Sequence, residues 1–417
     1  MVIFAQAAEK AYLCRRMMNE ATREFIRQHQ DDDIRGLALR GTKDPEVDLA
    51  FALQQIDGYR RAMEKLPSWA AIEGIVWPSH LSMEQCSSEQ TARYKAEVAG
   101  SGVSFVDLTA GFGVEAAFIA QGFQRAVCVE LQLELCAVSS ANFQLLGFQQ
   151  MEVVNGNGID YLHTMTPVDL IFIDPARRDE HGGRTFGIAD CTPNVLEIMD
   201  ELLTKALRVL IKLSPMLDWR KAVNDLGTKN VSAVHIVSVD NECKELLIEV
   251  VSDQYKVKSA EPSLRVVCVN LLSDGTSQKF EYDPSVSVAI EHPLPTSFQF
   301  LYEPNASLMK AGCFDVLARR YGVVQADVNS HLFFSDRQVA SFPGRGFIIE
   351  KVTSMNKREL KESLAGVTQT NITVRNFPMS AEELRRRLKL RDGGDVFIFA
   401  TTVENEGHRL FICRKIS

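Results

Sequence analysis

The sequence VSFVDLTAGFG (residues 103–113) decides the fold of this 417-residue chain. It is an apolar run of strand length that ends at the carboxylate of Asp107, and a loop with two glycines follows at once. Two later apolar runs also end at an acid, VCVE at Glu130 and LIFID at Asp174. Open α/β sheets bind ligands in the crevice outside the carboxyl ends of their parallel strands. The sequence therefore predicts a ligand site formed by three acids at strand ends.

The residue types at these strand ends suit a nucleoside that carries an amino group. Asp107 can receive a cationic amine, and Glu130 can accept hydrogen bonds from both ribose hydroxyls. Gly111 and Gly113 let the backbone approach the ligand closely. Asp174 would lie beside the reacting centre.

Four motifs in this order resemble the class I S-adenosylmethionine-dependent methyltransferases. They are DLTAGFG (residues 107–113), Glu130, NGNGID (residues 155–160) and DPARR (residues 174–178), and the resemblance covers roughly residues 86–255. It implies a Rossmann-like α/β domain with seven strands, S-adenosyl-L-methionine as cofactor and methyl donor, and no metal.

A nicotinamide-dependent enzyme is an alternative, because GFGVEA (residues 111–116) also fits the dinucleotide fingerprint G-x-G-x-x-A. Two features favour the methyltransferase. Asp107 precedes the glycines, where a dehydrogenase needs no acid, and Asp174-Pro175 has no role in hydride transfer.

The resemblance implies a set of site residues. The ammonium of the methionine part is expected at Asp107, the ribose diol at Glu130 and the adenine edge at Asn157, while Asp174 orients the acceptor or takes its proton. The alternative for Asp107 and Glu130 is a helix N-cap, and for Asn157 an ordinary turn. The full expected set is Asp107, Thr109, Gly111, Phe112, Gly113, Glu130 and Asn157 for the cofactor, and Asp174, Pro175 and Arg177 for catalysis.

The motif after the fourth strand departs from the Asp/Asn-Pro-Pro-aromatic of amino-methylating enzymes, because Arg177 replaces the aromatic residue. A guanidinium can stack on a base or pair with phosphate, so N-methylation is neither supported nor excluded. Arg177, Arg178 and Arg184 make the rim basic, or serve only as surface charge.

Other side chains near the expected site are further candidates or alternatives. Carbon-5 methylation of pyrimidines is disfavoured, because Ser214 stands where such enzymes place a cysteine. Cys191 is kept as an alternative nucleophile at a helix start, with Thr192 as cap and Pro193 as first helical residue. Lys95 is a candidate for the ligand's carboxylate. Lys212 and Asp218 either line the site or are structural.

Four regions are expected along the chain. Apolar residues at helical spacing predict helices over residues 1–85. Alternating strands and helices follow in 86–255, with two consecutive final strands, which predicts a mostly parallel sheet with one antiparallel strand. The downstream part resembles an uncharacterised bacterial methyltransferase family, which implies a ferredoxin-like module (256–344) and a basic THUMP-like module (345–417). Within them we expect a hairpin around Ser273-Asp274-Gly275 and one helix near 306–320.

The basic end of the chain predicts a partner. Residues 345–417 contain 14 Lys and Arg against 9 Asp and Glu, although the whole chain has a net charge of −8. THUMP domains are associated with RNA-modifying enzymes, so the resemblance implies an RNA substrate, tRNA or rRNA, held by Arg385, Arg386, Arg387 and Lys389. A solvated helix face is the alternative for these residues.

Composition indicates a soluble protein. Nine scattered cysteines without a C-x-x-C pair suggest reduced thiols, and neither a signal peptide nor a membrane-spanning run is recognisable, so we expect a cytoplasmic enzyme. The rival functions are a protein or small-molecule methyltransferase, and a non-catalytic nucleic-acid-binding protein with a vestigial nucleoside pocket.

Overall fold

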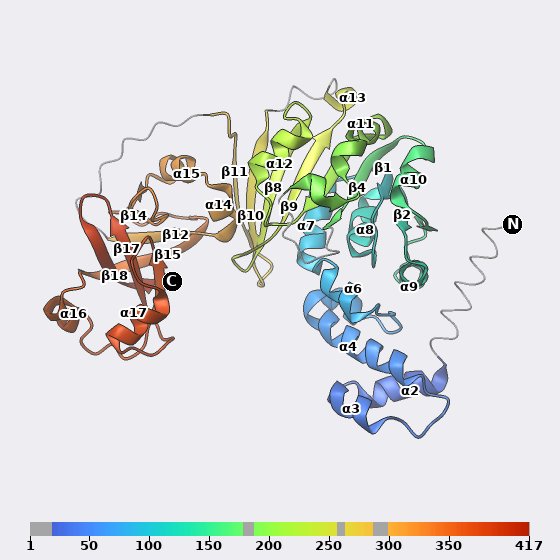
Figure 1. Ribbon diagram of the computed structural model, residues 1–417, viewed down its shortest axis with the longest axis horizontal. Coiled ribbons are helices and arrows are strands. Elements are labelled where there is room, and N and C mark those ends of the chain that lie inside the picture. The colour runs from blue at the N-terminus through green and yellow to red at the C-terminus, as the bar shows by residue number, and fades with distance from the viewer. Residues whose placement is uncertain (1–18, 178–186, 257–262, 287–298, 417) are drawn as a thin grey trace. The chain divides into compact units, whose positions relative to one another are not determined.

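The computed structural model describes residues 19–177, 187–256, 263–286 and 299–416 (Figure 1). Arg178 and Arg184 lie outside this part of the chain. The molecule divides into two compact units, one of residues 1–234 and 245–263, the other of residues 235–244 and 264–417.

Helices come first in the described part of the first unit, as the sequence predicts, and residues 1–18 of that prediction lie outside the described residues. Most start at a residue whose side chain accepts a hydrogen bond from a first-turn N–H, as Asn19, Asp48 and Ser88 do. The helices are α2 (Glu20–His29), α3 (Ile34–Arg40), α4 (Leu49–Lys65), α5 (Pro67–Ala70), α6 (His80–Gln85) and α7 (Glu89–Ala99).

A twisted sheet follows, and its strands alternate with helices (Figure 1). The strands are β1 (Gly102–Asp107), β2 (Phe123–Glu130), β3 (Met151–Asn155), β4 (Val168–Ile173), β7 (Ala206–Leu213), β8 (Val231–Val239) and β9 (Glu242–Val251). The helices are α8 (Val114–Ile119), the 3-10 turn η1 (Ala120–Gly122), α9 (Leu133–Leu145), α10 (Gly158–Thr164), α11 (Val195–Lys205), α12 (Trp219–Leu226) and α13 (Asp253–Lys256).

These strands have the order β8-β9-β7-β4-β1-β2-β3 within a sheet of nine strands. The pairs β1–β2, β1–β4, β2–β3 and β4–β7 are parallel, whereas β9 runs antiparallel to β7. The predicted mostly parallel arrangement with an antiparallel strand is therefore confirmed. The sheet has nine strands rather than the predicted seven, because a hairpin at residues 265–282 continues it beyond β8.

The predicted start of α11 is wrong. Its N-cap is Asn194, and Thr192 is joined to Pro193 by a cis peptide bond. Thr192 and Cys191 form the short strand β6 (Cys191–Thr192), which pairs antiparallel with β5 (Ala176–Arg177) after the 3-10 turn η2 (Ile188–Asp190). Because Cys191 and Thr192 pair with β5, helix α11 begins only at Val195.

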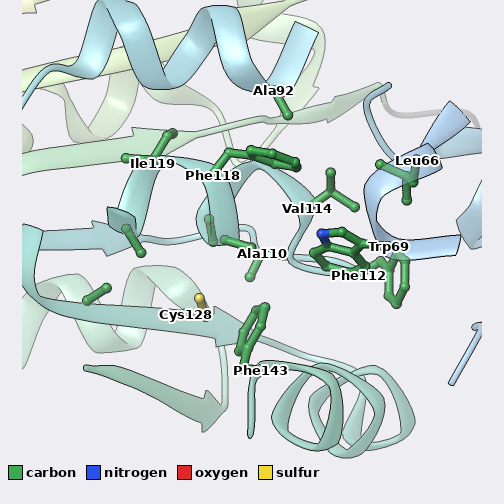
Figure 2. Close-up of a cluster of buried hydrophobic side chains, with 14 of the residues drawn as sticks. Leu66, Trp69, Ala92, Ala110, Phe112, Val114, Phe118, Ile119, Cys128 and Phe143 are labelled. Atoms are coloured by element: carbon green, nitrogen blue, oxygen red, sulfur yellow. The ribbon is translucent and has the colours of Figure 1, made fainter. Parts of the chain in front are cut away.

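One buried cluster joins the helical region to the sheet (Figure 2). Leu66 and Trp69 come from the helical region, while Phe112, Val114 and Phe143 come from the loop and helices that follow β1 and β2. The helical region therefore shares its core with the predicted cofactor loop.

The second unit contains a hairpin and a seven-stranded sheet. The predicted hairpin is confirmed: β10 (Arg265–Leu271) and β11 (Ser277–Tyr282) pair antiparallel around Gly275, which has φ +84°. The sheet has the order β13-β14-β12-β15-β18-β17-β16. Its strands are β12 (Phe300–Pro304), β13 (Val324–Gln325), β14 (Phe333–Ser335), β15 (Gly344–Thr353), β16 (Asn371–Arg375), β17 (Val396–Val403) and β18 (Gly407–Lys415).

Two features of this unit differ from expectation. The single helix expected near residues 306–320 is two, α14 (Ala306–Ala311) and α15 (Phe314–Tyr321), because Gly312 ends the first in a left-handed conformation. Strand β15 also pairs with both β12 and β18, so the two expected modules share one sheet. The remaining helices are α16 (Lys357–Ser363) and α17 (Ala381–Leu388).

Candidate functional site

The loop after β1 connects the three predicted acids. The backbone N–H of Thr109 donates to Asp107 Oδ1 at 2.9 Å, and Thr109 Oγ1 accepts from the N–H of Asp174 at 2.7 Å. The N–H of Gly111 donates to Glu130 Oε2 at 2.8 Å. Hydrogen bonds of residues 107–111 thus connect the ends of the adjacent strands β2, β1 and β4 in a single site.

Asp107 lies in an environment suited to bind a cation. It is 1% exposed, and burial raises the pKa of its carboxyl well above the ordinary value. The Thr109 hydrogen bond lowers this pKa, whereas the charges of Glu115, Asp174 and Glu130 raise it further. Among the described residues, no Lys or Arg forms a salt bridge with Asp107. A ligand ammonium would supply the missing positive charge.

Glu130 is half-buried and oriented by the backbone on both sides. Oε2 accepts from Gly111, and Oε1 accepts from the N–H of Gln132 at 2.7 Å. A carboxylate offers about four lone-pair sites, so capacity for a diol remains.

The two glycines of the loop have different reasons for lacking a side chain. Gly113 has φ +81°, and a Cβ there would lie 2.6 Å from Cζ of Phe143. Gly111 has φ +54°, but a Cβ there would meet nothing within 4 Å. Packing thus requires Gly113, whereas Gly111 leaves open space beside the backbone for a ligand.

The structure gives Asn157 and Phe112 local structural contacts. Asn157 is exposed, and its Oδ1 accepts from the N–H of Ile159 at 2.8 Å as the N-cap of α10. Phe112 is 3% exposed and lies edge-on against Trp69, with ring centroids 5.4 Å apart. Trp69 was not predicted from the sequence as a residue that supports the site.

Asp174, one of the catalytic candidates, lies next to Lys212 at the ends of β4 and β7. The side chain of Asp174 is 34% exposed and forms an ion pair with Lys212, whose side chain is 16% exposed. Burial raises the pKa of Asp174, and the charge of Lys212 opposes that shift. Pro175 is buried. Arg177 belongs to β5, but its side chain lies outside the described part of the structure.

Lys95 is not available to a ligand, so that expectation was wrong. Its ammonium is fully buried and donates to both carboxylate oxygens of Glu245, at 2.8 and 2.7 Å, and to Ser87 Oγ at 2.9 Å. Ser87 also donates to Glu115 Oε1 at 2.5 Å, and this oxygen lies 3.4 Å from Lys212 Nζ. We call Lys95, Glu245, Ser87, Glu115, Lys212 and Asp174 the charge network.

The two remaining candidates, Cys191 and Asp218, belong to a strand and to a helix cap. Cys191 is 2% exposed within β6 rather than at a helix start. Asp218 caps α12, accepting from the N–H of Lys221 at 2.8 Å. Across the described ranges, no group of three or more His, Cys, Asp or Glu residues could hold a metal ion.

The predicted basic face lies on α17 in the second unit. The capping box of Ser380 and Glu383 starts the helix, and Leu384 is buried. Arg386, Arg387 and Lys389 are exposed. Arg385 is half-buried and forms an ion pair with Asp392.

Two family models match the second unit. Residues 300–343 match a ferredoxin-like domain, and residues 344–415 match a THUMP domain-like family. No curated protein matches the chain significantly. Within the described residues, no helix is long and apolar enough to cross a membrane.

Solved structures resemble the chain over very different extents. TrmK from M. capricolum, in complex with S-adenosyl-homocysteine, is 13% identical over 39% of this chain and 68% of its own, with a TM-score of 0.31. A Pyrococcus horikoshii protein assigned as an RNA methyltransferase is 15% identical over 45% of this chain and 96% of its own, with a TM-score of 0.33.

A Porphyromonas gingivalis W83 protein assigned as a methyltransferase is similar over nearly the whole chain. It is 31% identical, the match covers 95% of this chain and 98% of that one, and the TM-score is 0.82. The sheet order, the motifs at its strand ends and the two matched domains agree with this similarity. The chain therefore belongs to the family of this protein, class I methyltransferases that have ferredoxin-like and THUMP-like domains after the catalytic sheet.

Proposed function

We propose that the protein transfers a methyl group from S-adenosylmethionine to RNA. The observation that carries the proposal is the loop at residues 107–113, which connects three acids to one another at the ends of adjacent parallel strands. The whole-length similarity to a protein assigned as a methyltransferase supports the same activity.

The residues present fit the cofactor. Asp107, a buried carboxyl with no lysine or arginine partner among the described residues, would hold the ammonium group. Glu130 would hold the ribose diol, and the open space at Gly111 would admit the sugar and the methionine part. Thr109 and Phe112 would fix the loop, Gly113 would allow its packing, and Asn157 would offer its amide group to the adenine edge. The bound sulfonium supplies an activated methyl group.

The protein's contribution to this reaction is chiefly alignment. Methyl transfer is an in-line displacement, and holding two reactants close in the right geometry can lower a barrier by roughly 7–11 kcal/mol. Asp174 and Pro175 directly follow β4, where they would lie beside the nucleoside, and Arg177 follows them in β5. We assign acceptor binding to this segment.

We assign RNA binding to residues 345–417. The match to a THUMP domain-like family and the balance of 14 basic against 9 acidic residues support it. The exposed residues Arg386, Arg387 and Lys389 would contact phosphates, which gives salt-dependent affinity. The catalytic part would be residues 86–255, supported by residues 1–85. Residues 256–344 would link the catalytic part to the RNA-binding part. We place the enzyme in the cytoplasm.

The test is transfer of a radioactive methyl group to RNA from cells that lack this protein. We expect label in RNA with the full chain, and none with Asp174→Ala. Asp200→Ala, at an exposed position on α11, is the matched control and should transfer normally. Label that enters protein or a small molecule, but not RNA, would favour the rival methyltransferases. If Asp174→Ala leaves all measurable functions intact, the non-catalytic alternative is favoured.

The RNA-binding assignment has its own test. Arg386→Glu with Arg387→Glu should raise the KM for RNA and leave affinity for S-adenosylhomocysteine unchanged. Lys357→Glu with Arg358→Glu on α16, a pair that is also exposed and basic, is the control. Equal effects of the two pairs would mean that α17 has no special part in RNA binding.

A further inference from the structure

We propose that the methyl acceptor is a hydroxyl oxygen, the 2′-hydroxyl of an RNA ribose, and that Asp174 and Lys212 activate it together. This inference rests on the proposed function, since it names the atom that the same site would methylate. It comes from the charge network, most of which the proposed methyl transfer does not otherwise use.

The charge network has a closed end, where the side chains are buried, and an open end, where they are partly exposed. At the closed end, Lys95 is 0% exposed and Glu245 4% exposed in their side chains. At the open end, Asp174 directly follows β4 and lies beside Lys212 of the paired strand β7, and both side chains are partly exposed. The cation therefore reaches the edge of the sheet where an acceptor would lie against Asp174.

The network fixes the position and the charge of Lys212. Burial would lower the pKa of its ammonium, but the charges of Asp174, Glu115 and Glu245 outweigh burial and raise that pKa. Glu115 is held in turn by Ser87 and lies 3.8 Å from the ammonium of Lys95. Lys212 is therefore a permanent cation beside the carboxylate that would take the acceptor's proton.

A permanent cation at this position distinguishes between classes of acceptor. When a neutral amine attacks a methyl group, positive charge develops on its nitrogen, and a nearby ammonium opposes that charge. When a hydroxyl loses its proton during attack, negative charge develops on its oxygen, and the same ammonium stabilises it. Fixed donors that meet a developing oxyanion are typically worth about 10²–10³-fold in rate.

The hydroxyl O–H bond breaks, and the proton passes to the ionised carboxylate of Asp174. The hydroxyl oxygen forms a bond to the methyl carbon while the carbon–sulfur bond breaks, and that electron pair stays on sulfur. The products are a methyl ether, a neutral thioether and a protonated Asp174, which then releases its proton to water.

The ribose 2′-hydroxyl is the RNA group that meets this description at every internal nucleotide. The 3′ and 5′ oxygens of the chain are esterified to phosphate, whereas the 2′-hydroxyl is free and distinguishes RNA from DNA. The position of Arg177, in place of an aromatic residue that would stack on a base, agrees with an acceptor on the sugar.

Alkaline digestion of the methylated RNA tests the proposal with the unmodified full chain. A 2′-methyl ether blocks cleavage of the adjacent phosphodiester, so we expect the label in alkali-resistant dinucleotides. Label found only in mononucleotides would place the methyl group on a base and overturn the hydroxyl acceptor, while leaving RNA methylation intact. Binding of S-adenosylhomocysteine without label in any RNA would overturn both the RNA substrate and this inference.

Variants of Lys212 test its part in the step. Lys212→Ala should lower kcat by about 10²–10³-fold and change the KM for RNA and the affinity for S-adenosylhomocysteine by only a few-fold. Lys212→Arg, which keeps the cation and the balance of the network, should retain far more activity and a native melting temperature. Lys221→Ala, at an exposed ion pair on α12, is the control. A Lys212→Ala protein that keeps most of its kcat, or an arginine variant that is folded yet as slow as the alanine variant, would contradict the role of this charge.

Discussion

The ring of Phe112 lies edge-on against the indole of Trp69, with centroids 5.4 Å apart and planes inclined at 71° (Figure 2). Phe112 lies between Gly111 and Gly113 in the loop after β1, and Trp69 belongs to the short helix α5 of the helical region. A second indole, that of Trp77, lies 6.3 Å from the same ring. The helical region thus supports the loop that we propose binds the cofactor.

Removing the Trp69 side chain should therefore weaken cofactor binding as well as stability. Trp69→Ala creates a large cavity, and such truncations cost about 3–5 kcal/mol. We expect the affinity for S-adenosylhomocysteine to fall at least about tenfold, because the loop loses a packing partner at Phe112. Phe51→Ala, in the same cluster but on α4, should lower the melting temperature with little effect on affinity. Titration calorimetry of both variants decides, and parallel losses of affinity would argue against a specific role for Trp69.

Neutralising Asp107 should stabilise the protein and impair binding. Its buried carboxyl has a raised pKa in the folded state, so ionisation at neutral pH costs folding free energy. Asp107→Asn keeps an oxygen for the Thr109 N–H and removes that cost, so its melting temperature should exceed that of the wild type at neutral pH. Affinity for S-adenosylhomocysteine should fall at least about tenfold, because the ligand ammonium loses its charged partner.

The pH dependence of these two effects has a definite sign. The stability difference should disappear below the unfolded-state pKa of about 3.9 and grow as pH rises. Wild-type affinity should rise with pH over the range above the ordinary carboxyl pKa in which Asp107 ionises, while the affinity of the Asn variant should be flat. A wild-type affinity that declines with rising pH in this range would contradict an ammonium at Asp107.

Gly113→Ala should be more harmful than an alanine at another glycine of similar backbone conformation. Gly113 has φ +81° and would place its Cβ 2.6 Å from Phe143, whereas exposed Gly147 has φ +80° and nothing within 4 Å. Backbone strain costs about 1–2 kcal/mol at either position, and the clash adds about 1–3 kcal/mol at Gly113 only. Denaturant unfolding of the two variants measures the difference. Equal destabilisation would mean that the Phe143 contact relaxes freely.

Glu115 should stabilise the fold except in acid. Burial would raise the pKa of its carboxyl, but Lys212, Lys95 and the Ser87 hydrogen bond lower it to about 2 from an ordinary 4.5. The resulting stability, on the order of 3 kcal/mol, is present above pH ~4.5 and is lost as pH falls towards ~2. Glu115→Gln should lose this amount at neutral pH and show a flatter acid limb of unfolding free energy against pH. Exposed Glu134→Gln is the control, and a Glu115→Gln protein with wild-type acid sensitivity would count against the charge network.

The sequence predicts the sheet well because its strands are apolar runs with sharp ends. The apolar runs that end at Asp107, Glu130 and Asp174 fall on β1, β2 and β4, which end at Asp107, Glu130 and Ile173. The helix expected near 306–320 is interrupted at Gly312, because a residue in the left-handed conformation ends a helix whatever the apolar pattern around it. Helix α11 begins later than expected because β6 pairs with β5, and no pattern in the neighbouring sequence predicts this pairing.

The site is only partly visible in the sequence, for a physical reason. Asp107, Gly111 and Glu130 lie in motifs at strand ends, so their neighbourhood follows from the parallel sheet. The charge network joins Lys95 to Glu245 across 150 positions, and such a pairing depends on packing rather than on local spacing. The charge network could have been inferred from the lysine and the acids that stand within otherwise apolar segments, because buried charges need partners of opposite charge.

Titration of the full chain with S-adenosylhomocysteine is the most direct test of the cofactor site at the ends of β1, β2 and β4. We predict a one-to-one isotherm with a dissociation constant below about 100 µM, weakened at least about tenfold by Glu130→Ala and unaffected by Asp200→Ala. Absence of binding by the folded protein at millimolar ligand, or binding that Glu130→Ala leaves unchanged, would contradict it.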